Sequence, residues 1–152
     1  MASSGGACTC TPLMRRRYLA RLSGPLLDRV DVKVELLPVS RVELLSDRHF
    51  AESSPVVAAR VAAARERAAA RLKNTPWRLN AEIPGSELRR AFPPSSGSLV
   101  PLERAMDLGQ ISARGVDRVI RVAWTLADIA GIARPTVSET SYALALWLGA
   151  GA

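Results

Sequence analysis

Two arginines stand in sequence contexts that could bring a fixed cation to a phosphate group. The first, Arg29, follows a Ser-Gly-Pro-Leu-Leu-Asp turn, with Asp28 before it and Asp31 two residues beyond it. The guanidinium group is planar, permanently charged and well matched to phosphate and carboxylate oxygens. An exposed pair between Arg29 and one of these acids would contribute well under about 1 kcal/mol. Both interpretations stay open from the residues alone: a local ion pair, or an arginine presented at a subunit edge toward a neighbour's phosphate.

The second arginine, Arg114, lies in Ser112-Ala-Arg-Gly115, which predicts the first turn of a helix capped by Ser112. The helix dipole disfavours a cation there by roughly a few tenths of a kcal/mol. The position makes sense if an anion is held by the helix N-terminus and the arginine together. A solvated first-turn arginine is the equally open alternative.

Two cysteines, Cys8 and Cys10, have the spacing of two thiolate ligands for zinc. A structural zinc site needs four ligands, and His49, the single histidine, is far along the chain. The pair therefore predicts at most a partial zinc site, with two exposed thiols as the alternative.

A third group of arginines indicates nucleic-acid binding. Arg60, Arg67 and Arg71 fall close together on one face of a predicted helix at about 100° per residue, and Arg78 follows it. The chain of 152 residues has a net charge of +7 and a pI of about 10.6, and almost all of its basic residues are arginine. An arginine- and alanine-rich composition can also arise without any functional cause, so the charge alone decides nothing.

The sequence excludes several function classes. It has no G-x-x-x-x-G-K-[ST] phosphate loop and no G-x-S-x-G nucleophile elbow, so we assign no catalysis to this polypeptide by itself. No apolar run reaches the roughly 18 residues of a membrane span, and the N-terminus does not look like a secretory signal. We expect a soluble, cytoplasmic protein that has no membrane partner.

The elements that must position these residues are mostly helices. Val30–Leu36 alternates apolar and charged residues, which predicts one half-buried strand. No second strand of this quality follows, and a lone strand has no ladder partner. Residues 1–14 are expected to form a loose tail. Caps, prolines and apolar periodicity predict helices over about 54–73, 86–92, 101–109, 113–130 and 137–148.

Two long motifs resemble the ComM/YifB group of magnesium-chelatase-like AAA+ ATPases. The first is Cys-x-Cys followed by Arg-Tyr-Leu-Ala-Arg-Leu-Ser-Gly-Pro-Leu-Leu-Asp-Arg-Val-Asp, and the second runs from Ser112 to Gly131. The likeness covers about 8–148. It implies a mainly α fold, a helical bundle of AAA+ lid and C-terminal helices preceded by one orphan β-strand from the ATPase core. Residues 1–40 would be the core remnant and residues 41–152 the lid and C-terminal domain.

The resemblance also implies roles. Such proteins form rings, taken as hexamers, with ATP and Mg²⁺ between adjacent copies. Arg29 matches the arginine finger that reaches the neighbour's γ-phosphate, and Arg114 matches the sensor-2 arginine that contacts nucleotide of its own subunit. The resemblance also implies that Cys8 and Cys10 would complete a four-cysteine cluster that serves as a zinc site. The implied activity is DNA remodelling or branch migration in competence or recombination.

The family's phosphate loop, its acidic magnesium-binding motif and the first cysteine pair are not in this sequence. The chain is therefore interpreted as a C-terminal piece, inactive alone and without a bound cofactor. One alternative is a basic helical module that binds nucleic acid without an ATPase role. The other is the lid of a true metal-chelatase motor subunit, which the Ser-Gly-Pro-Leu-Leu-Asp-Arg turn disfavours.

Overall fold

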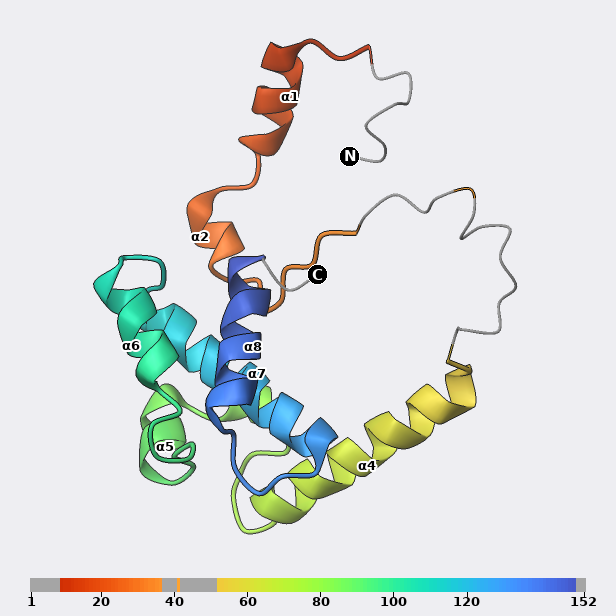
Figure 1. The fold of residues 1–152 in the computed structure, drawn as a ribbon, viewed down its shortest axis with the longest axis vertical. Coiled ribbons are helices and arrows are strands. Elements are labelled where there is room, and N and C mark those ends of the chain that lie inside the picture. The colour runs from red at the N-terminus through yellow and green to blue at the C-terminus, as the bar shows by residue number, and fades with distance from the viewer. Residues whose placement is uncertain (1–8, 37–40, 42–51, 150–152) are drawn as a thin grey trace.

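The computed structural model describes residues 9–36, 41 and 52–149, and the described part is mainly helical (Figure 1). This confirms the predicted fold class. The helices are α1 (Pro12–Leu19), α2 (Gly24–Leu27), α4 (Ser54–Leu72), the 3₁₀ helix η2 (Asn80–Glu82), α5 (Gly85–Arg90), α6 (Val100–Asp107), α7 (Ala113–Ala130) and α8 (Val137–Leu148).

The ends of the two central helices follow from their capping residues. The Ser112 hydroxyl accepts the Gly115 N–H at 3.2 Å at the start of α7, and Gly131 ends that helix with a φ of 74°. At the start of α8, the Glu139 carboxylate accepts the Thr136 N–H at 2.9 Å and the Thr136 hydroxyl at 2.6 Å. The hydroxyl bond lowers the pKa of Glu139, with the backbone amides adding to the effect. These are the caps that the sequence predicts.

The predicted strand over Val30–Leu36 is not confirmed. Within the described residues this segment has no strand beside it, so its backbone cannot form a ladder. It lies instead against the end of α8, where the Lys33 N–H donates to the Leu146 carbonyl at 2.8 Å. The ammonium of Lys33 lies 4.8 Å from the centre of the Trp147 ring. The alternating valines that suggested a half-buried strand are partly exposed, with Val34 at 53%.

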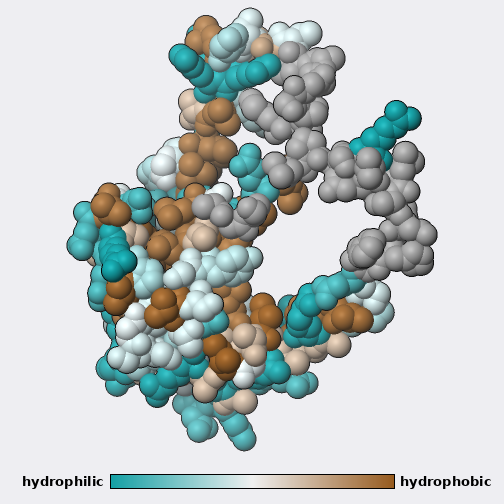
Figure 2. Space-filling view, viewed as in Figure 1, coloured by the Kyte–Doolittle hydropathy of each residue, from teal (hydrophilic) through white to brown (hydrophobic). Residues whose placement is uncertain are grey.

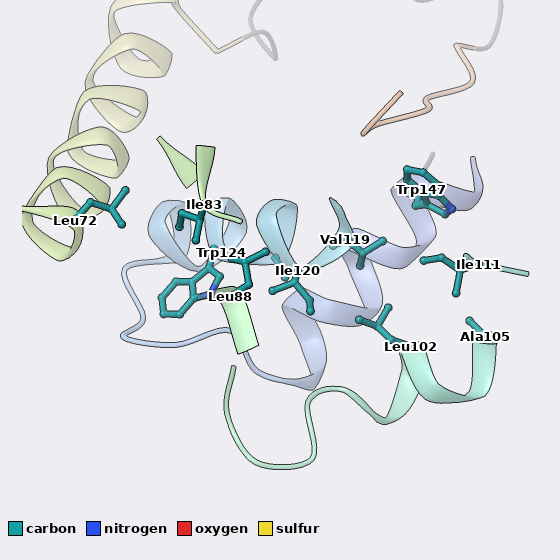
Figure 3. Close-up of a cluster of buried hydrophobic side chains, with 12 residues drawn as sticks. Leu72, Ile83, Leu88, Leu102, Ala105, Ile111, Val119, Ile120, Trp124 and Trp147 are labelled. Atoms are coloured by element: carbon teal, nitrogen blue, oxygen red, sulfur yellow. The ribbon is translucent and has the colours of Figure 1, made fainter. Parts of the chain in front are cut away.

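The hydrophobic core surrounds α7. This helix packs against α4, α5, α8 and η2, and α6 packs on α8. Figure 3 shows Trp124, Leu72 and Ile83 at one end of the core and Trp147 and Ile111 at the other. The Trp124 indole N–H donates to the Phe92 carbonyl at 3.1 Å, so this buried ring also satisfies its polar atom.

A buried polar group joins α4, η2 and α7, and we call Arg71, Asn80 and Asp128 the Asp128 cluster. The Asp128 side chain is 4% exposed and accepts from both terminal nitrogens of Arg71, one of them at 2.8 Å, and from the Asn80 amide at 3.0 Å. The Arg71 guanidinium lies 4.2 Å from the centre of the Trp124 ring. The charge of Asp128 is thus paired and hydrogen-bonded, as a buried charge must be.

The helix α1 corrects the expectation of a loose tail for residues 12–14, whereas residues 1–8 of that predicted tail lie outside the described residues. Thr11 caps it by accepting the Met14 N–H at 3.3 Å, and Pro12 begins it. No residue of α1 is buried, and the helix lies outside the bundle in Figure 1. Its apolar side chains are exposed on the surface of the α1–α2 region in Figure 2. No helix in the described ranges is both long and apolar enough to cross a membrane.

Candidate functional site

Arg29 lies in the turn that follows α2. Pro25 lies in the first turn of that short helix, and the Arg29 N–H closes its end by donating to the Leu26 carbonyl at 3.0 Å. The Arg29 side chain is exposed and makes no ion pair with any residue that the structure describes. The local pair with Asp28 or Asp31, one of the two interpretations of the sequence, does not form here.

Arg118 forms an ion pair with Asp31, one of the two acids that could have paired with Arg29. One terminal nitrogen of Arg118 donates to the backbone carbonyl of Arg29 at 3.1 Å and also to the Asp31 carboxylate. The Arg118 side chain is 23% exposed and that of Asp31 is 51% exposed. Both residues line a recess of about 280 Å³ beside α7. Arg118 therefore fixes the backbone that carries Arg29 and leaves the Arg29 guanidinium unpaired within the described part of the chain.

Arg114 lies where the sequence predicts it, in the first turn of α7. Its side chain is exposed and forms no ion pair with the residues described. The next residue, Gly115, is buried, and a Cβ there would lie 2.6 Å from Ile111 Cγ1 and 3.0 Å from Trp147 Cζ2. Glycine therefore lets the first turn of α7 approach α8 closely, which sets the position of Arg114.

The structure brings the two candidate phosphate-binding arginines to one end of α7. Arg114 and Arg118 are four residues apart on this helix, so their side chains lie on the same face. Since Arg118 holds the Arg29 carbonyl, the Arg29 turn is attached one helical turn beyond Arg114. We call Arg29, Asp31, Arg114 and Arg118 the arginine site. Sequence reasoning missed Arg118, although its spacing from Arg114 was a usable signal.

The basic ridge of the sequence divides into arginines with different surroundings. Arg60 binds the Glu52 carboxylate with two hydrogen bonds of 2.7 and 2.8 Å, which lower the pKa of that carboxyl. Arg67 donates to the backbone carbonyl of Asp128 at 2.7 Å, and Arg71 belongs to the Asp128 cluster. These three guanidinium groups are engaged within the chain.

Arg78 differs from these three arginines in its surroundings. Its side chain is exposed, while its backbone N–H donates to Glu82 at 2.7 Å. With Arg65 it borders an apolar groove of about 630 Å³ between α4 and the second half of α7. The nucleic-acid role of these arginines stays a prediction, and Arg78 is the one whose guanidinium has no hydrogen bond or ion pair among the described residues.

Only one of the two cysteines of the predicted partial zinc site lies within the described residues. Cys10 is exposed, and Cys8 falls in a part of the chain that the structure does not describe. No group of three or more metal-binding side chains occurs among the residues that were placed. The zinc expectation stays a prediction.

Two family comparisons cover most of the chain. Residues 51–146 match the family described as magnesium chelatase, subunit ChlI C-terminal. Residues 1–44 match the family described as magnesium chelatase, subunit ChlI. The boundary between the matches falls between the arginine-finger candidate and α4.

Curated relatives extend this result. An uncharacterized protein of Mycobacterium tuberculosis is 49% identical over 137 residues, which are 90% of this chain and 27% of the relative. The uncharacterized protein YifB of Escherichia coli is 40% identical over 79% of this chain and 23% of its own length. Competence protein ComM of Haemophilus influenzae is 33% identical over 85% of this chain and 25% of its own length. The chain thus spans about a quarter of the length of these relatives.

Proposed function

Because this chain belongs to the magnesium chelatase subunit ChlI family, we propose that it is the part of a ring-forming AAA+ ATPase that contacts nucleotide from two sides. Arg29 is proposed as the arginine finger toward the neighbouring subunit, and Arg114 as the sensor-2 arginine of its own subunit. The observation that carries this proposal is that the Arg29 guanidinium is exposed and unpaired among the described residues. The nearby carboxylate of Asp31 is bound by Arg118 instead.

Each arginine has a role in phosphoryl transfer. In the proposed ATPase, bound ATP with Mg²⁺ would supply the phosphoryl group. Arg29 would stabilise negative charge that develops on that group, and a fixed cation of this kind accelerates hydrolysis by about 10³–10⁵-fold. Arg114, at the positive end of α7, would hold phosphate oxygens in place. Unpaired guanidinium groups are available to bind an anion such as phosphate. A guanidinium already bound to a carboxylate would first have to break that ion pair.

The division of the chain follows from the same assignment. We propose that residues 1–40 belong to the ATPase core and that residues 41–152 form the lid and C-terminal helices. The separate family matches over residues 1–44 and 51–146 support a division of the chain in this region. Copies of the protein would be the ring partners, with a hexamer as the expected size.

We propose DNA as the material on which the ring acts, through branch migration or a related remodelling step in competence or recombination. The relative printed as a competence protein and the net charge of +7 support this. A simple DNA-binding module without an ATPase role is less well supported, since Arg60, Arg67 and Arg71 are engaged within the chain. The lid of a metal-chelatase motor subunit is disfavoured by the Ser-Gly-Pro-Leu-Leu-Asp-Arg turn.

The experiment uses a chimera in which this chain replaces the matching 137-residue region of the Mycobacterium tuberculosis relative. Arg29→Ala and Arg114→Ala are each expected to lower ATP turnover by at least about a hundredfold. Arg104→Ala is the matched control, because this exposed arginine of α6 has no ion pair among the described residues.

Mixing the two inactive variants separates the two roles. An Arg29→Ala subunit has an intact nucleotide site of its own, and an Arg114→Ala neighbour can still give it a finger. We expect mixed rings to regain turnover that neither variant has alone. Failure to regain turnover in rings shown to be mixed would refute the assignment of Arg29 to the neighbouring site.

A further inference from the structure

The proposed function gives the helix α7 a connection to two different nucleotides. Under the proposed function, Arg114 in its first turn contacts nucleotide of its own subunit. Arg118, one turn later, donates to the carbonyl of Arg29 at 3.1 Å and to the Asp31 carboxylate. The Arg29 side chain is the group that would reach the nucleotide of the next subunit. One rigid element is therefore bonded to both sites.

The close packing of α7 would make any shift of this helix a shift of the whole helix. Gly115 sits against Ile111 and Trp147, where a Cβ would have no room, and most of the inner face of the helix is buried against α4 and α8. Close-packed interiors transmit displacement instead of absorbing it. A shift of the first turn on nucleotide contact would therefore be carried to Arg118.

The segment that carries Arg29 is held to the helices α7 and α8 by hydrogen bonds. Arg118 holds the chain on both sides of Val30, at the Arg29 carbonyl and at the Asp31 side chain. A second tie at Lys33, whose N–H donates to the Leu146 carbonyl at 2.8 Å, keeps the following residues on α8. The Arg29 peptide therefore follows α7, and the guanidinium that extends from it follows as well.

We propose that Arg118 is a positioning residue that couples adjacent nucleotide sites of the ring. Contact between Arg114 and nucleotide in one subunit sets the place of Arg29 at the nucleotide of its neighbour through α7, Arg118 and Asp31. This inference rests on the proposed function, and it adds a mechanism by which neighbouring sites hydrolyse ATP cooperatively. Allosteric coupling requires such an element that both sites bias.

The Arg118–Asp31 pair is suited to this task. Asp31 is 51% exposed, and exposed ion pairs contribute little to folding stability. Removing the pair should therefore leave the fold intact and affect mainly the placement of Arg29. Arg89 and Asp117 provide a matched control, because this pair also joins α7 to another element, with Arg89 54% and Asp117 22% exposed.

The test measures ATP turnover against ATP concentration in the chimeric ring. Arg118→Met and Asp31→Asn are expected to lower kcat at least about tenfold with little change in nucleotide affinity, and to reduce the Hill coefficient to about 1. Arg118→Lys keeps a hydrogen-bond donor and should therefore retain part of the parent kcat and part of the cooperativity. Arg89→Met should match the parent ring. Melting curves establish whether each variant is folded. If Arg118→Met does not fold, Asp31→Asn and Arg118→Lys provide the test.

Two results would overturn the inference. One is a parent ring that shows no cooperativity, and the other is an Arg118→Met ring whose kcat and Hill coefficient match those of Arg89→Met. The mixing experiment with Arg29→Ala and Arg114→Ala distinguishes these from failure of the proposed function. If mixing restores turnover while Arg118→Met stays cooperative, the two nucleotide roles stand and only the coupling fails.

Discussion

Substitution of Asp128 by alanine should be among the most destabilising single changes in this chain. The carboxylate is 4% exposed and binds both terminal nitrogens of Arg71, whose side chain is 17% exposed. Alanine would leave the guanidinium partly buried against Trp124 without a counter-charge. Breaking a buried pair on one side costs about 3–5 kcal/mol. The lost bond to Asn80 acts in the same direction.

Urea unfolding of the 152-residue chain, followed by circular dichroism, measures this loss. A domain of ordinary stability has about 5–15 kcal/mol in total, so Asp128→Ala should move the midpoint far toward zero urea. Asp117→Ala is the matched control on the same helix, because its partner Arg89 is 54% exposed. That change should cost under about 1 kcal/mol.

The double variant Arg71→Met/Asp128→Leu tests the reason for the loss. If the penalty comes from an unpaired buried charge, replacing both partners by apolar side chains should recover most of the stability. A loss below about 1 kcal/mol for Asp128→Ala, or no recovery in the double variant, contradicts this reasoning.

The other predictions concern α7, α8 and the basic surface. Gly115→Ala should destabilise the chain by about 1–3 kcal/mol through overpacking, whereas Gly24→Ala, whose Cβ would meet nothing within 4 Å, should not; melting temperatures compare the two. The pKa of Glu139 is lowered by its bond to a hydroxyl, so its stabilisation is present above the ordinary carboxyl pKa and is lost as pH falls through the lower folded value. Glu139→Gln should therefore flatten the acid side of a stability-against-pH curve. In DNA titrations, Arg78→Ala should reduce the slope of log K against log salt by about 0.9 if that side chain contacts a phosphate. Arg71→Met should leave the slope unchanged, because this guanidinium is bound to a carboxylate; an equal change in both would contradict the exposed position of Arg78.

The helices α4 to α8 could be predicted from the sequence because their signals are local. Capping residues such as Ser112 and Thr136 mark the starts of helices, and glycines such as Gly131 mark their ends, without reference to the rest of the fold. Arg114 could be placed for the same reason. These residues act within their own turn, so the sequence around them contains the required information.

Features that depend on distant partners could not be predicted in this way. The alternating residues of Val30–Leu36 look like a strand, but a strand needs a neighbour, and this segment lies on α8 instead. Arg71 was grouped with the nucleic-acid-binding candidates because Asp128, its partner, is far along the chain. The contact of Arg118 with Asp31 was missed for the same reason. The helix α1 was missed because none of its residues is buried.

The position of Trp147 gives this chain a natural optical probe. Its indole is 3% exposed, lies 4.8 Å from the Lys33 ammonium on one side and borders Gly115 on the other. The remaining tryptophans, Trp77 and Trp124, both pack edge-to-face on Phe92 at the opposite end of the core. With those two replaced by phenylalanine, fluorescence would come from a single ring between the segment after Arg29 and the first turn of α7. Its emission would then record, in real time and without an attached dye, whether those two parts of the molecule move together.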